Sequence, residues 1–388
     1  MALTHYIQSA VLAHSQLVHA NSGVNANEAL IPSKFLTHGV APDMLIQASC
    51  ERLNSMMSGL NKWRSHPYRR RTPNPAIIWK SENARILDFA PQSPAPFTLV
   101  IPSLINRHYI LDLMEENSFL RRMVRNGLHP VVLDWGEPYP GRGPDSLREH
   151  MVSIVEPAFC HLEECSNSKP GVLGYCMGGT LAVGLAAHLG ERLSKLCLIG
   201  TPWDFSKLEG IAKSMKNHIL EQGIEQFDLS LASMGLQFGA IPAQVFQHLF
   251  ALMAPMQMVK KFSKFDKMDL ASQSAKQFVA VEDWLADPVP VPTQAARNIL
   301  LDWYVHNQTG NLDWAPFGKN TDPAHISCPS LIVTGRKDHI VPPAVSNVLK
   351  DLIPNSKHLE VDMGHVGMIV GRRSHAEVAK PISAFFCR

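Results

Sequence analysis

The sequence predicts an α/β fold with a mostly parallel central sheet and helices on both of its faces. Short apolar runs, typical of buried strands, alternate with longer segments of helical periodicity. The expected strands cover residues 97–101, 130–133, 171–173, 196–199, 330–333 and 357–361. The expected helices cover residues 118–126, 147–164, 177–189 and 344–352. Strands that alternate with helices indicate parallel pairing, because a parallel pair needs a long crossover connection.

The composition excludes several classes of protein. Among the 388 residues, 18% are charged and 45% are hydrophobic, and the formal net charge is +2. This balance argues against a nucleic-acid-binding protein, which needs a strongly basic face. No run reaches about 18 uninterrupted apolar residues, and no basic segment followed by an apolar run opens the chain. We therefore expect neither a transmembrane segment nor a secretory signal.

The seven cysteines are odd in number and scattered along the chain. This pattern indicates reduced thiols in a cytoplasmic protein rather than a disulfide framework. Cys160, His161 and Cys165 lie close together, but no second pair stands at ligand spacing, so we expect no metal site. The sequence also lacks the glycine-rich phosphate loop that ends in Lys-Ser or Lys-Thr.

Three parts follow one another along the chain. Residues 1–80 predict a helical N-terminal extension and linker, with helical spacing at 11–20 and 41–57. Residues 81–204 together with 325–388 predict the α/β core. The stretch 205–324 predicts helices without strands and reads as a cap inserted over an active site. An independent helical domain is the alternative; the strand pattern that resumes after this stretch favours the cap.

The segment Gly174-Tyr175-Cys176-Met177-Gly178-Gly179 carries the most specific signal. It follows an apolar strand and precedes a helix of small residues, as does the nucleophile elbow of the α/β-hydrolase fold. The sharp turn crowds the nucleophile against its neighbours, so small residues are needed two positions before and after it. Gly174 and Gly178 fill both positions. We therefore predict that Cys176 is the nucleophile of an α/β-hydrolase fold.

Cysteine replaces the usual serine of this elbow. The free N–H groups and the dipole at the start of a helix stabilise a thiolate. A thiolate attacks thioesters readily and leaves readily afterwards, which favours acyl transfer over simple hydrolysis. The alternative interpretation, a buried structural cysteine in a glycine-rich turn, does not account for the strand, the helix and both glycines together.

The fold requires an acid and then a histidine after the nucleophile. Asp338 follows the strand at 330–333, and His365 follows the strand at 357–361. We expect His365 to take the thiol proton and Asp338 to orient its imidazole. His339 is an alternative base, and Asp362 is an alternative acid that lies close to His365 along the chain.

An oxyanion hole needs two backbone N–H groups. By analogy with the fold, one comes from Met177, directly after the nucleophile. The other comes from the loop after an early strand, residues 102–106, where Ile105 is our candidate.

These motifs resemble the polyhydroxyalkanoate synthase family over residues 101–367. The modified lipase box of that family is the most specific match, and it corresponds to residues 173–180 here. The other matching segments are Ile101-Pro102 with Ile105-Asn106, Tyr109 to Leu113, Leu133-Asp134-Trp135, Asp338 to Pro342, and Gly364-His365. Several motifs in the same order make chance resemblance improbable.

The resemblance implies an acyltransferase that polymerises (R)-3-hydroxyacyl-CoA, as poly-3-hydroxybutyrate polymerases do. The acyl group is carried on Cys176, and CoA is released. A CoA thioester is the substrate, and no cofactor is needed. In the family the aspartate helps to deprotonate the 3-hydroxyl of the incoming unit. The active form is a homodimer, and the polyester accumulates in cytoplasmic granules whose surface is a further partner.

The chain resembles a short variant of the family. Pro343 replaces an aromatic residue, and residues 368–388 differ from the usual ending. Two other functions remain open. A synthase-like hydrolase, either an esterase or an intracellular polyhydroxyalkanoate depolymerase, would release hydroxy acids. A non-enzymatic granule-associated protein would show a broken triad, and this sequence shows none.

Overall fold

The computed structural model describes residues 42–138 and 143–387. The described chain divides into two compact units. The smaller unit holds residues 42–69 and Gln247–Ala286, and the larger unit holds the rest.

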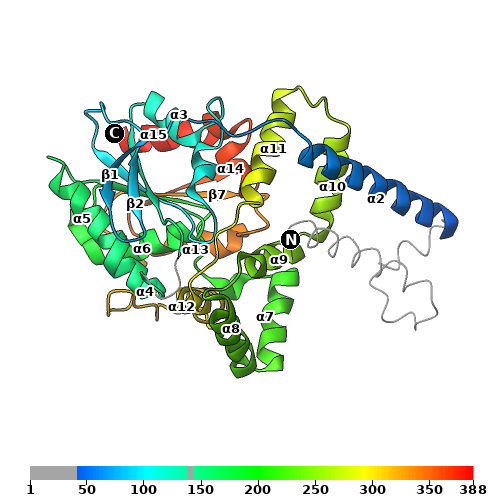
Figure 1. Ribbon diagram of the computed structural model, residues 1–388. Helices are drawn as coiled ribbons and strands as arrows, with labels where there is room; N and C mark the ends of the chain where they lie inside the picture. The colour runs from blue at the N-terminus through cyan, green and yellow to red at the C-terminus, as the bar shows by residue number, and fades with distance from the viewer. Residues whose placement is uncertain (1–41, 139–142, 388) are drawn as a thin grey trace. The chain divides into compact units, whose positions relative to one another are not determined.

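Eight strands of the described chain form one sheet in the larger unit (Figure 1). Their order across the sheet is β1-β2-β4-β3-β5-β6-β7-β8. The pairs β1–β2 and β2–β4 are antiparallel, and all other pairs are parallel. The strands are β1 (Ala76–Lys80), β2 (Arg85–Asp88), β3 (Phe97–Ile101), β4 (His129–Asp134), β5 (Gly171–Tyr175), β6 (Leu196–Ile199), β7 (Ser330–Gly335) and β8 (Ser356–Val361).

The central strands are buried along their whole length. Every residue of β4, β5, β6 and β7 is buried. Strands of a parallel sheet are covered on both faces, which explains why they appear in the sequence as continuous apolar runs. The sequence located these strands for that reason.

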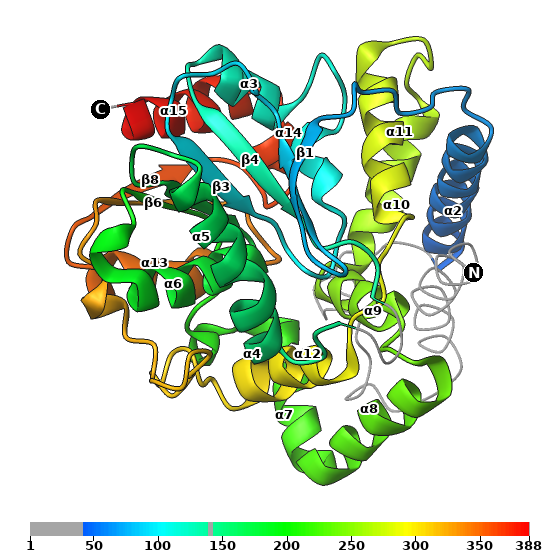
Figure 2. The same ribbon diagram turned by 60° about the vertical axis from the view of Figure 1, so that its left-hand side comes forward.

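Helices cover both faces of this sheet (Figures 1 and 2). One face carries α3 (Phe119–Arg125), α14 (Gly367–Val370) and α15 (Lys380–Cys387). The other carries α4 (Leu147–His150), α5 (Glu156–Glu164), α6 (Met177–Leu189) and α13 (Pro343–Leu352). Ser118 caps α3 by accepting from the N–H of Arg121, and Ser146 forms a capping box with Glu149 at the start of α4.

The connection from β6 to β7 is helical, as expected for residues 205–324. It contains no strand of the sheet among its described residues. Its main helices are α7 (Gly210–Gln222), α8 (Ile224–Phe238), α9 (Ala243–Met253), α10 (Pro255–Asp266), α11 (Gln273–Leu285), α12 (Thr293–Arg297) and the π-helix η6 (Asn298–Val305). The division into units cuts through this connection, because Gln247–Ala286 groups with the chain before Arg70. The division into extension, core and cap stays a prediction.

The smaller unit is built on the contact of α2 (Pro42–Arg64) with α10. Gly59 lies against the backbone of Phe262, where a Cβ would come within 3.0 Å of the carbonyl group. Met56, Leu60 and Phe262 are buried together beside this crossing. Asp266 accepts hydrogen bonds from Ser55 and Ser58 and pairs with Lys62. An apolar crossing and the polar contacts of one carboxylate thus join two distant parts of the sequence.

Two expectations need correction or completion. The sequence predicts residues 76–80 as the end of the N-terminal extension, but they form the edge strand β1 of the sheet. The edge position explains the error, because β1 has no fully buried residue and lacks the apolar run of the inner strands. The helix expected at 41–57 continues to Arg64. The helical segment expected at 11–20 lies outside the described residues.

No helix within the described ranges is both long and apolar enough to cross a membrane.

Candidate active site

Cys176 occupies the sharp turn between β5 and α6. Its backbone angles, φ 57° and ψ −132°, lie in a region that residues with a Cβ atom rarely adopt. Its own N–H donates to the carbonyl of Ile199 at 2.9 Å, and its carbonyl accepts from the N–H of Gly179 at 2.8 Å. These bonds to β6 and α6 hold the strained residue in place. The nucleophile elbow predicted from the motif is therefore present.

The glycines of the motif are required by close backbone approach. A Cβ on Gly174 would lie within 3.0 Å of the Gly179 Cα atom. A Cβ on Gly178 would lie within 3.0 Å of the carbonyl oxygens of Ile101 and Pro102. Neither backbone can move aside, so only glycine fits at both positions, as the sequence pattern indicated.

Asp338 and His365 meet at the same edge of the sheet. Asp338 follows β7, and His365 follows β8 in the next parallel strand connection. The Oδ2 atom of Asp338 lies 2.6 Å from Nδ1 of His365. Asp338 is 3% exposed and His365 is 7% exposed. This pair has the geometry of an acid that orients a catalytic imidazole.

The imidazole of His365 is enclosed. It stacks on the ring of Tyr175, with ring centroids 5.0 Å apart and an interplanar angle of 26°. Burial alone lowers the pKa of His365, but the negative charges of Asp338 and Cys176 outweigh burial and raise this pKa well above its ordinary value. Its Nε2 atom is buried and has no hydrogen bond of good geometry among the described residues, although Cys176 lies within electrostatic reach.

Cys176 differs from the other cysteines in its surroundings. It is partly exposed. Cys197 and Cys328 are buried, and burial raises the pKa of both thiols, which makes them poor nucleophiles. Cys176, by contrast, lies within electrostatic reach of His365.

The two alternative residues have other positions. His339 is exposed to solvent. Asp362 pairs with Lys337 at 2.8 Å, and that lysine holds the pKa of the Asp362 carboxyl below its usual range. The structure thus brings Asp338, not Asp362, to His365.

The candidate oxyanion donors are both buried. Met177 is the first residue of α6, and the N–H groups of a first helical turn have no partner within the helix. The N–H of Ile105 donates to Ser103 Oγ at 3.3 Å within its own loop. Because of this bond, the N–H of Ile105 is less available to an oxyanion than the N–H of Met177. The sequence did not show this difference.

Sequence reasoning did not identify the role of Asp134 and Trp135 at the end of β4. The indole Nε1–H of Trp135 donates to the carbonyl of Pro102 at 3.2 Å. Asp134 pairs with Arg85 at 2.8 Å and with His108 at 3.1 Å. Burial raises the pKa of the Asp134 carboxyl, but its bonds to His108 and Arg85 outweigh burial and lower it. The available signal was the Asp-Trp pair at the end of a buried strand.

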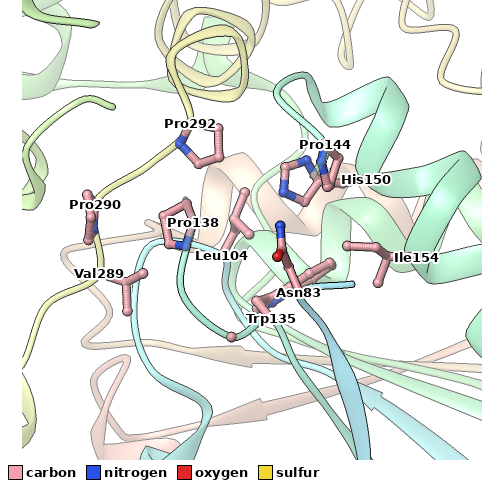
Figure 3. Close-up of a pocket in the computed structure, with 11 residues that line it drawn as sticks. Asn83, Leu104, Trp135, Pro138, Pro144, His150, Ile154, Val289, Pro290 and Pro292 are labelled. Atoms are coloured by element: carbon pink, nitrogen blue, oxygen red, sulfur yellow. The ribbon is translucent and has the colours of Figure 1, made fainter. Parts of the chain in front are cut away.

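A shallow pocket lies beside the loop that follows β3. Leu104 and Trp135 form part of its wall, together with His150 and the segment that contains Val289 and Pro290 (Figure 3). The wall is mostly apolar, and it contains none of the three predicted catalytic residues. Within the described chain, no cluster of three or more His, Cys, Asp or Glu side chains could hold a metal ion.

A family model for the α/β-hydrolase fold matches residues 137–371, which is more than half of the chain. The chain belongs to the α/β-hydrolase fold family. The predicted fold class is therefore confirmed, and the elbow, acid and histidine of this α/β hydrolase follow β5, β7 and β8.

Several relatives, including the following three, carry the name poly(3-hydroxyalkanoate) polymerase subunit PhaC. The relative from Haloferax mediterranei is 28% identical over 323 residues, which is 81% of this chain and 64% of the relative. The relative from Haloarcula marismortui is 29% identical over 292 residues, which is 74% of this chain and 60% of the relative. The relative from Allochromatium vinosum is 25% identical over 298 residues, which is 76% of this chain and 81% of the relative. The chain spans less than two thirds of the first two. These similarities confirm the predicted resemblance.

Proposed function

We propose that the chain is an acyltransferase that polymerises (R)-3-hydroxyacyl-CoA through an acyl group bound to Cys176. One observation carries the proposal: a thiol on a strained elbow lies within electrostatic reach of His365, which Asp338 holds at 2.6 Å. The similarity to relatives named poly(3-hydroxyalkanoate) polymerase supplies the substrate class. The reaction uses a CoA thioester as substrate and no cofactor.

Acylation begins at the thiol. His365 takes the proton of Cys176, and the raised pKa of this histidine favours the resulting thiolate–imidazolium pair. The thiolate attacks the thioester carbonyl, and the N–H groups of Met177 and Ile105 stabilise the negative oxygen that forms. CoA leaves as the thiol after taking the proton from His365, and the acyl group remains on sulfur.

Chain growth uses the same residues in the second half of the cycle. The 3-hydroxyl of the next unit attacks the acyl group on Cys176, and His365, oriented by Asp338, accepts its proton. A new ester forms, and the Cys176 sulfur is released for the next round. Attack by water instead would release a hydroxy acid. We further propose that the active form is a homodimer at the surface of cytoplasmic polyester granules.

The product separates the candidate functions. The protein is incubated with 3-hydroxybutyryl-CoA, CoA release is followed with a thiol reagent, and the product is weighed and hydrolysed. The proposal expects CoA together with insoluble polyester. Monomeric acid alone would establish the hydrolase instead, and no CoA release would leave only a non-enzymatic role.

Cysteine variants test the mechanism. We expect Cys176→Ala to lose at least about three powers of ten in rate, as the removal of other covalent nucleophiles does. Cys160→Ala is the matched control, because Cys160 is also partly exposed but contacts Arg192 on another part of the unit. The control should keep wild-type turnover. Unchanged turnover of Cys176→Ala would overturn the mechanism.

A further inference from the structure

The indole of Trp135 joins two neighbouring strand ends. Trp135 follows β4 directly and is 9% exposed. Its Nε1–H donates to the carbonyl of Pro102 at 3.2 Å. Pro102 follows β3 directly and begins the loop that contains Ile105. Because β3 and β4 are parallel neighbours, this single bond connects the end of one strand to the loop after the other.

The same carbonyl lies against the nucleophile elbow. A Cβ on Gly178 would come within 3.0 Å of the Pro102 oxygen, so this oxygen is packed against the first turn of α6. That turn also carries Met177. The Pro102 carbonyl therefore packs against the elbow and also accepts a hydrogen bond from the Trp135 indole.

The indole is itself held in place. Its ring packs edge-on against His150, with centroids 5.8 Å apart and an interplanar angle of 69°. The Nδ1 atom of His150 lies 2.8 Å from the carbonyl of Ser146, which fixes the imidazole. Leu104 and Trp135 border the same pocket, and Leu104 immediately precedes Ile105 (Figure 3). The donor is thus pre-organised by packing.

We propose that Trp135 is a positioning residue for acyl transfer: its indole N–H fixes the Pro102 carbonyl and so holds the Ile105 loop at the oxyanion site. The inference rests on the proposed function. Trp135 acts through the loop and does not touch the acyl group. An oxyanion donor is worth about 10²- to 10³-fold in kcat, and a displacement of about 1 Å can cost on the order of 10²-fold.

Two variants separate the N–H from the bulk of the side chain. Trp135→Phe keeps an aromatic ring against His150 but removes the donor. Trp135→His loses the six-membered ring but keeps an N–H at the corresponding place in its five-membered ring. We expect acylation of Cys176 by 3-hydroxybutyryl-CoA at saturating substrate to slow about tenfold or more in Trp135→Phe. Trp135→His should be faster than Trp135→Phe, and KM should change much less than kcat.

The rate at which iodoacetamide alkylates Cys176 tests whether Trp135 has only a structural role. If it had, its replacement would disturb the elbow and change this rate as well. Displacement at a saturated carbon develops no oxyanion, so this rate should stay at the wild-type value in both variants. Trp303→Phe is the matched control, because Trp303 is also buried and its indole nitrogen has no partner among the described residues. The control should leave both rates unchanged.

Two results would overturn the inference: wild-type acylation in Trp135→Phe, or an equal loss of acylation and alkylation, which would indicate general damage to the elbow. Failure of the proposed function appears differently, as absence of CoA release by the wild-type protein. Acylation by a p-nitrophenyl ester then still compares Trp135→Phe with Trp135→His and decides the role of the indole.

Discussion

Asp338 holds His365 with one carboxylate oxygen while the backbone holds the other. Oδ2 lies 2.6 Å from Nδ1 of His365, and Oδ1 accepts from the N–H groups of Ile340 and Val341 at 2.9 and 2.8 Å. The carboxylate cannot rotate without breaking these two bonds. The orientation of the imidazole is therefore fixed by the turn after β7 before any substrate arrives.

This relationship predicts the effect of Asp338→Asn. The amide keeps the size of the side chain, but it favours the wrong tautomer of His365 and removes the charge that stabilises the imidazolium. We expect kcat for CoA release to fall by about 10³- to 10⁴-fold. Asp362→Asn is the matched control, since Asp362 pairs with Lys337 instead. Equal losses in both variants would show that the acid has been assigned to the wrong residue.

The raised pKa of His365 predicts a pH-dependent contribution to stability. Its folded pKa lies well above the ordinary value of 6.5, so protonation stabilises the native state fully below that value. This stabilisation is lost as the pH rises through the folded pKa. His365→Gln should therefore lower the free energy of unfolding more at about pH 5.5 than at about pH 9. Urea unfolding at both pH values measures the difference; a pH-independent difference would contradict it.

The elbow predicts intolerance of a single methyl group. Gly178→Ala places a Cβ against two backbone carbonyls, and overpacking of this kind costs about 1–3 kcal/mol or more. Gly367→Ala is the matched control, because its nearest neighbour would be the Met363 Cβ at 3.8 Å, an ordinary contact. Thermal unfolding should show a lower midpoint only for Gly178→Ala. A similar drop in both would point to glycine loss in general rather than to the elbow.

Two leucines of α8 predict opposite outcomes. Leu231 is 0% exposed, and Leu229 is 70% exposed. Leu231→Ala should lower the free energy of unfolding by about 2–5 kcal/mol, because it leaves a cavity. Leu229→Ala should change it by less than about 0.5 kcal/mol. Denaturant unfolding measures both, and a large effect of Leu229→Ala would mean that its exposed side chain is covered by a partner.

The sequence predicted the structure best where the requirement on a residue is local. The inner strands β3 to β7 are apolar because both faces are covered, and the glycines around Cys176 are needed by the elbow itself. Both features could be predicted locally. The edge strand β1 could not, since half-exposed residues there carry no continuous apolar run.

Contacts between distant residues were beyond the sequence. The stacking of Tyr175 on His365 and the bond from Trp135 to Pro102 depend on how the loops after different strands meet. Nor could periodicity show that Gln247–Ala286 groups with the chain before Arg70, because helical spacing identifies an apolar face and not its partner.

That grouping has a consequence for how the chain acquires its structure during synthesis. Ser55 on α2 and Asp266 on α10 are 211 residues apart. At about 5–20 residues per second, a ribosome needs roughly 10–40 s to make the intervening chain. The apolar side chains Met56 and Leu60 have no α10 to pack against during that interval. Closing so long a loop also costs entropy and slows folding. The helix α2 is therefore translated early but completes its packing late.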